Sequence, residues 1–126
     1  MDEATLVRAY DDRDGVTAAF NLNILHRLNR ELGANFDTGC FRHWARWNRF
    51  KSRIEMHLES TRDQCVNIPA AQLSIQFAAF ETIHTENSYK FTRNTLCALL
   101  DDAGFGIERT WTDPQQWYAL TLARLR

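Results

Sequence analysis

The stretch "FRHWARWNRFKSRIEMHLES", residues 41–60, decides the fold class of this sequence. Its two ends, 41–47 and 53–60, carry apolar and aromatic residues, and the polar run "NRFKS" separates them. Ile54, Met56 and Leu58 alternate with polar residues, which is the period of a β-strand that turns one face toward a core. The stretch therefore predicts two strands joined by a short polar connection.

Two shorter strand patterns follow this pair. The runs "CVNI" (65–68) and "LSIQF" (73–77) are apolar, and Pro69 stands between them. Because proline lacks the N–H that a strand ladder needs, we place it in the connection. The two runs are expected to continue the first pair as an antiparallel meander.

Helical patterns precede the strands. Residues 5–12 have a short helical pattern, which the run "DDRDG" ends. Between residues 16 and 32 apolar side chains recur at spacings of three to five, with Asp14 as a candidate N-cap and Gly33 as a left-handed stop. The sequence thus begins with a short helix and a long one.

A third helix and a hairpin close the chain. Thr92 is a suitable N-cap for a helix that reaches residue 103, and Gly104 ends it. The run "GIERTW", the turn residues "TDPQ" and the run "WYALTLARL" then predict an antiparallel hairpin. The expected fold class is α+β, with N-terminal helices, an antiparallel β meander, and then a helix plus a C-terminal β hairpin.

Composition limits the classes of function. The 126 residues fit one domain of ordinary size, and 15 Lys and Arg against 16 Asp and Glu provide no net field for nucleic acid or an anionic membrane. Cys40, Cys65 and Cys97 are an odd number without a CxxC pair, which suits a reducing compartment. The longest apolar run, "FAAF", is far too short to span a bilayer. We expect a cytoplasmic protein with neither a nucleic-acid nor a membrane partner.

The run "TENSYKF" raises the question of a binding site. On a strand, Glu86 and Ser88 would share one side while Asn87 and Tyr89 take the other. A carboxylate accepts a hydrogen bond from a ring N–H and a hydroxyl either donates or accepts, so the pair suits both nitrogens of an imidazole. Polar clusters at the ends of strands and helices are nevertheless common, and this simpler interpretation stays open on the residues alone.

Other candidate constellations are weaker. The stretch "RHWARWNRFK" interleaves aromatic and basic residues as single-strand nucleic-acid binders do, but Glu55 and Glu59 offset its charge. A strand with a buried tryptophan and solvated arginines is the favoured interpretation. The four histidines form no metal-ligand spacing, and no nucleophile elbow or phosphate-binding loop is present, so neither a metal nor a catalytic nucleophile is predicted.

Several long motifs taken together resemble one family. These are "AYDDRDGVTAAFNLNILHRLNRELGANFD", "WNRFKSRIEMHLES", "IHTENSYKFT" and "AGFGIERTWTDPQQWYALTLAR", which occur in this order. They are similar to the C-terminal part of the histidine-specific, S-adenosylmethionine (SAM)-dependent methyltransferases, which make N-alpha-trimethylhistidine (hercynine) on the ergothioneine pathway. The resemblance implies that residues 1–90 form a substrate-binding subdomain, and that 91–126 form the last helix and β hairpin of the methyltransferase domain.

The resemblance also implies roles for four residues. Glu86 and Ser88 match the family's imidazole-recognising pair, Tyr10 matches a tyrosine that binds the substrate carboxylate, and Met56 matches a residue in the pocket wall. We expect Glu86, Ser88 and Met56 to line a common concavity with Tyr10 at its other end. No catalytic residue is assigned within this chain.

By the same resemblance, SAM is bound mainly by an N-terminal methyltransferase half that the chain lacks. The sequence agrees independently, because a Rossmann-type cofactor site needs a glycine-rich turn after a strand and the five glycines here fit helix ends and turns. We expect a piece of a longer enzyme, inactive alone, whose partners are the histidine substrate and that N-terminal half. The apolar "WYALTLARL" further predicts a homo-oligomer or domain-swapped dimer of the isolated chain. The alternative is a non-enzymatic α+β module that binds a small molecule or a partner.

Overall fold

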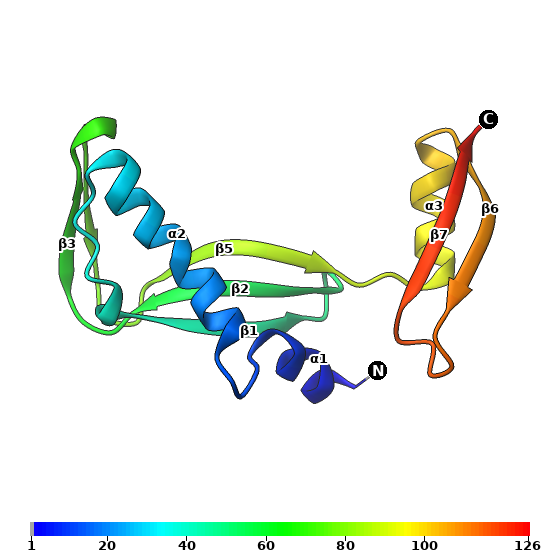
Figure 1. Ribbon diagram of the computed structural model, residues 1–126, viewed down its shortest axis with the longest axis horizontal. Coiled ribbons are helices and arrows are strands. Elements are labelled where there is room, and N and C mark those ends of the chain that lie inside the picture. Colours follow the sequence, from blue (N-terminus) through cyan, green and yellow to red (C-terminus); the bar gives the residue numbers. More distant parts are fainter. Residues whose placement is uncertain (1) are drawn as a thin grey trace. The chain divides into compact units, whose positions relative to one another are not determined.

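Residues 2–126 are described in a computed structural model of the chain, and they divide into two units, Asp2–Tyr89 and Lys90–Arg126. The three α-helices and seven antiparallel strands within these residues confirm the α+β class. No helix among them is long and apolar enough to cross a bilayer. The first unit holds α1 (Glu3–Tyr10), α2 (Val16–Leu32), β1 (Phe41–Asn48), β2 (Arg53–Ser60), β3 (Gln64–Ile68), β4 (Leu73–Phe77) and β5 (Thr82–Tyr89), and the second holds α3 (Arg93–Asp102), β6 (Phe105–Thr112) and β7 (Ala119–Leu125) (Figure 1).

The strand order differs from the expected meander. The main sheet of the first unit has the order β1-β2-β5, while β3 and β4 pair with each other as a separate two-stranded sheet. β2 and β5 have eight residues each, whereas β3 and β4 have five each, so β5 is the strand that matches the free edge of β2. Glu86 and Ser88 therefore lie on a strand of the main sheet, which ends at Tyr89.

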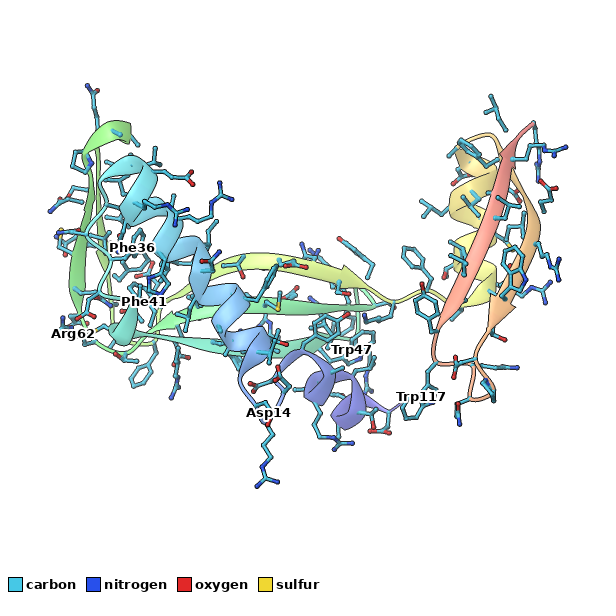
Figure 2. All side chains as sticks on the ribbon, viewed as in Figure 1. Asp14, Phe36, Phe41, Trp47, Arg62 and Trp117 are labelled. Atoms are coloured by element: carbon cyan, nitrogen blue, oxygen red, sulfur yellow. The ribbon has the colours of Figure 1, made fainter. Side chains whose placement is uncertain are left out.

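The long helix α2 lies across the main sheet and covers the core of the first unit (Figure 1). Phe36 and Phe41 lie beside each other near the C-terminal half of α2 (Figure 2), with ring centroids 5.7 Å apart, and Phe77 contacts Phe41 edge-on at 5.4 Å. Edge-to-face packing of this kind is favourable for aromatic rings. The buried core residues are Leu25, Phe36, Phe41, Leu58, Val66, Ile68 and Phe77.

The start of α2 corrects the expected cap. The N-cap is Gly15 rather than Asp14, and the carboxylate of Asp12 accepts hydrogen bonds from the backbone N–H groups of Val16 and Thr17 at 2.9 and 2.8 Å. Hydrogen bonds from Thr17 and Val16 lower the pKa of Asp12 to about 2. Asp12 thus satisfies the free donors of the first turn from outside the helix. The predicted end at Gly33 is confirmed, with φ at 64°.

The second unit has the predicted helix and hairpin. Thr92 caps α3, its hydroxyl accepting from the backbone N–H of Thr95 at 3.2 Å. Gly104 follows the helix with φ at 79°, and β6 pairs with β7 in an antiparallel hairpin. No residue of this unit is fully buried. The unit therefore has little core of its own.

Candidate functional site

The main sheet of the first unit has two chemically different faces. Residues that pair across strands lie on the same face, so each row of three can be read from the register. One face, here called the helix face, carries α1 and α2 and has the rows Trp47–Ile54–Ser88, Ala45–Met56–Glu86 and His43–Leu58–Ile83. The opposite one, here called the polar face, has the rows Asn48–Arg53–Tyr89, Arg46–Glu55–Asn87 and Trp44–His57–His84.

The four residues singled out from the sequence meet on the helix face. Glu86 lies directly opposite Met56 in the register of β2 and β5, and Ser88 follows two residues later on the same face. The hydroxyl oxygens of Tyr10 and Ser88 lie 2.7 Å apart, which is a hydrogen bond between residues 78 positions apart in the chain. From the sequence, Tyr10 was expected at the end of the site opposite to Ser88. In the structure it lies directly beside Ser88. The ligand-binding roles of the four stay predictions.

Glu86 is placed where a ligand could reach it. Its side chain is exposed, and its carboxylate has no hydrogen bond or ion pair with another side chain of residues 2–89. Met56 beside it is 3% exposed and is therefore buried. An accessible carboxylate next to the hydroxyl groups of Tyr10 and Ser88 provides an acceptor for N–H donors and a donor–acceptor pair.

Three polar residues that the sequence analysis did not single out lie behind these four. Asn21 of α2, His43 of β1 and Thr85 of β5 are joined by hydrogen bonds. Asn21 gives no signal in the sequence, because a polar residue in an amphipathic helix is normally assigned to solvent. Thr85 directly precedes the Glu86–Ser88 segment, and that position is the only hint the sequence offers.

The polar face contains a buried carboxylate. Glu55 is 2% exposed and accepts hydrogen bonds from Arg46 at 2.8 Å, Asn48 at 2.8 Å and Arg53 at 2.8 and 3.0 Å. Burial opposes ionisation of Glu55, but the hydrogen bonds from Arg53, Asn48, Arg46 and His57 outweigh that effect and hold its pKa far below the usual range. The charge is thus neutralised inside the layer.

Two histidines extend this polar layer. The ring of His57 stacks on that of His84 with centroids 4.5 Å apart, and His57 Nε2 lies 3.2 Å from a carboxylate oxygen of Glu55. Burial lowers the pKa of His57, and the hydrogen bond to Glu55 offsets this only in part. The three side chains bring possible metal-ligand atoms within 4.8 Å of one another. The guanidinium groups of Arg46 and Arg53 on the same carboxylate oppose a further cation, so the arrangement is that of an internal ion-pair network.

Comparison with known proteins identifies relatives of the chain. The model of the family described as "Histidine-specific methyltransferase, SAM-dependent" matches residues 1–125. The histidine N-alpha-methyltransferases of Mycolicibacterium smegmatis (strain ATCC 700084 / mc(2)155) and Mycobacterium tuberculosis (strain CDC 1551 / Oshkosh) are each 48% identical to it over 122 residues. These alignments cover 97% of this chain and 38% of each relative, so the chain spans well under half the length of the relatives it matches.

Proposed function

The chain belongs to the family of histidine-specific, SAM-dependent methyltransferases, and on that premise we propose that it forms the histidine-binding part of an enzyme that methylates the alpha-amine of histidine. The product would be trimethylhistidine (hercynine), an intermediate of the ergothioneine pathway. The observation that carries the proposal is the exposed carboxylate of Glu86, which lies on one face with Ser88 and Met56. The 48% identity to two histidine N-alpha-methyltransferases supports it.

The imidazole is the group that this arrangement suits. Glu86 accepts a hydrogen bond from one ring N–H, which fixes the tautomer of the neutral ring. The hydroxyl of Ser88 donates to the second ring nitrogen of the neutral ring or accepts from it when the ring is charged. Met56, which pairs with Glu86 across the sheet, forms the apolar wall behind the ring. An amino acid without two ring nitrogens makes at most one of these two hydrogen bonds, and the lost bond is a source of specificity.

Tyr10 has a different task in this proposal. Its hydroxyl binds the substrate carboxylate, and the hydrogen bond to Ser88 at 2.7 Å links it to the imidazole end of the site. Held at both ends, the substrate presents its neutral alpha-amine in one direction, and positioning of this kind is a main contribution to methyl transfer.

The residues of this chain do not fit a cofactor site of the Rossmann type. Among the described residues, the connection from a strand into an α-helix is 90–92, between β5 and α3, and it contains no glycine. A glycine-rich turn is what allows backbone N–H groups to approach such a cofactor closely. We therefore assign SAM, which supplies the methyl group, to a part of the enzyme outside the matched region. No step of the transfer is assigned to groups of this chain other than substrate binding.

A chimaeric enzyme tests the proposal. In it, this chain replaces the segment of the Mycolicibacterium smegmatis methyltransferase that aligns with it, and methyl transfer from labelled SAM to histidine is measured. We expect transfer to histidine, with the trimethylated product identified by mass spectrometry. A folded chimaera that methylates no histidine would contradict the proposal and would favour the non-enzymatic α+β module.

A further inference from the structure

The amide of Asn21 is buried at the point where α2 meets three strands. Asn21 is 4% exposed. Its Nδ2 donates to the backbone carbonyl of His57 at 3.1 Å and to Nδ1 of His43 at 3.0 Å, and its Oδ1 accepts from the hydroxyl of Thr85 at 2.6 Å. Both amide protons and the carbonyl oxygen are used, and the backbone carbonyl of His57 accepts only, so the amide has one orientation that satisfies all partners.

On one side, Asn21 determines how the end of α1 is held. Because Nδ1 of His43 accepts from the amide, the ring proton is on Nε2, which lies 2.7 Å from the backbone carbonyl oxygen of Tyr10. That carbonyl can only accept, so the Nε2 proton is donated to it. The chain of two hydrogen bonds fixes the backbone at Tyr10, and from this position the tyrosine hydroxyl reaches Ser88.

On the other side, Asn21 holds an irregularity in β5. His57 pairs with His84 and the next residue back along β2, Met56, pairs with Glu86, so Thr85 is an extra residue without a partner. Its hydroxyl lies 2.6 Å from Oδ1 of Asn21 and 3.0 Å from the backbone oxygen of Met56. These contacts anchor a one-residue β-bulge to the helix and to the central strand.

The bulge decides which face Glu86 occupies. Side chains alternate along a strand, so a regular strand with Ile83 on the helix face would place Glu86 on the polar face. The extra residue Thr85 reverses the alternation, and Ile83, Glu86 and Ser88 all lie on the helix face. A strand with the same residues but no bulge, and with Ile83 kept on the helix face, would turn Glu86 and Ser88 away from Met56.

We infer that Asn21 is a positioning residue of the histidine site, which acts through His43 on Tyr10 and through Thr85 on the Glu86–Ser88 pair. The inference rests on the proposed function for the identity of the ligand. Asn21 does not touch the ligand itself. Its amide sets the placement of both sides of the site with one fixed set of hydrogen bonds.

The test compares Asn21→Leu with a matched variant, Asn29→Leu, in the chimaera. Asn29 lies on the same helix and its amide also makes two hydrogen bonds, both to the backbone of Phe36 at 2.8 Å, away from Glu86 and Ser88. Both variants lose a partly or fully buried amide network, so both lower the unfolding midpoint. Asn21→Leu should raise KM for histidine at least tenfold with KM for SAM unchanged, and Asn29→Leu should change neither KM.

Thr85 provides a second pair of variants in case Asn21→Leu does not fold. Thr85→Val removes the hydroxyl and keeps the branched shape, whereas Thr85→Ser keeps the hydroxyl. We expect Thr85→Val to raise KM for histidine and Thr85→Ser to retain the original value. In the chain of 126 residues, nuclear Overhauser contacts between the backbones of Met56 and Glu86 should weaken in Thr85→Val and persist in Thr85→Ser.

Glu86→Ala separates this inference from the proposed function. If Glu86→Ala raises KM for histidine while Asn21→Leu behaves like Asn29→Leu and Thr85→Val like Thr85→Ser, the positioning role is overturned and the proposed function stands. If Glu86→Ala leaves KM for histidine unchanged, the proposed function fails, and with it the role of Asn21 in a histidine site.

Discussion

Glu55 shows how single residues set the stability of the main sheet. A carboxylate that is 2% exposed would normally take up a proton, yet three neighbouring side chains from β1 and β2 keep Glu55 charged. Nearly every residue of β2 is buried, so its charges can be compensated only within the layer. The polar face therefore depends on complete pairing of its charges.

We expect Glu55→Gln to lower the free energy of unfolding by about 3 kcal/mol, since it leaves the guanidinium of Arg53 with a neutral partner in a buried layer. The Arg53 side chain is only 11% exposed and cannot regain full hydration. Urea unfolding measures the change. Glu31→Gln is the matched control, because the Arg27–Glu31 pair is exposed and its loss should have little effect. Equal effects of the two substitutions would argue against this description of the polar face.

His57 makes stability depend on pH. Histidine in an unfolded chain has a pKa near 6.5, and burial lowers the pKa of His57 in the folded state. The unfolded state therefore binds a proton first as the pH falls, and stability decreases below about pH 6.5. The neighbouring groups are Trp44, His84, Glu55 and Arg46, and Arg46 opposes a second positive charge at this position.

The midpoint of urea-induced unfolding is measured at pH 7.5 and at pH 5.5, for the unsubstituted chain and for His57→Gln. We expect a lower midpoint at pH 5.5 in the original chain and a smaller difference in the variant. The same pH dependence in both chains would mean that His57 is not the group responsible.

At the scale of elements, the local sequence patterns predicted the faces of strands and the ends of helices better than they predicted which strands pair. Alternation along the strand predicted that Glu86 and Ser88 share a face, and the caps at Gly33 and Thr92 were predicted from residue type. The bulge at Thr85 was not predicted, because no side-chain pattern distinguishes an extra residue in a strand from a regular one. The strand that pairs with β2 was also missed, since several apolar runs compete for the same edge and the choice depends on tertiary contacts.

The rotation of α2 explains why Asn21 was missed. Val16 and Phe20 are 69% and 65% exposed, although they belong to the apolar pattern that identified the helix. The side that faces the sheet instead carries the buried Asn21 and Leu25. Helical periodicity predicts that a helix exists, but with apolar residues on two sides it does not choose the buried one.

The β6–β7 hairpin has exposed apolar side chains and open edges. Leu120 and Leu122 are 57% and 47% exposed, and within residues 2–126 the strands β6 and β7 pair only with each other. A unit of this size without a fully buried residue gains little stability by itself. We propose that the isolated chain associates through this hairpin, as a homo-oligomer or domain-swapped dimer, because unpaired strand edges favour pairing with another chain.

Light scattering tests that association. We expect the chain of 126 residues to show a mass above that of a monomer at high protein concentration, and Leu120→Lys to shift it toward the monomer, since a charge on this strand opposes burial of the edge. Phe20→Lys is the control, because Phe20 is exposed on α2, and it should leave the mass unchanged. A monomer at all concentrations would refute the proposal.

At the scale of the whole molecule, the chain corresponds to 38% of the length of each relative. In the proposed function, this chain binds the histidine substrate and the remainder of the enzyme binds SAM. We therefore expect the purified chain of 126 residues to transfer no methyl group from SAM. Release of labelled product from SAM and histidine by the chain alone, at a rate above the background without protein, would show that this division is wrong.

The central claim is that Glu86 and Ser88 recognise the imidazole of histidine, and its most direct test is kcat/KM for histidine in the chimaera with Glu86→Ala. Removing the carboxylate should lower kcat/KM for histidine about 10- to 100-fold, the loss expected for one hydrogen bond to a charged group. The loss should fall mainly on KM, with KM for SAM unchanged. A variant with the kcat/KM of the original chimaera would contradict the claim.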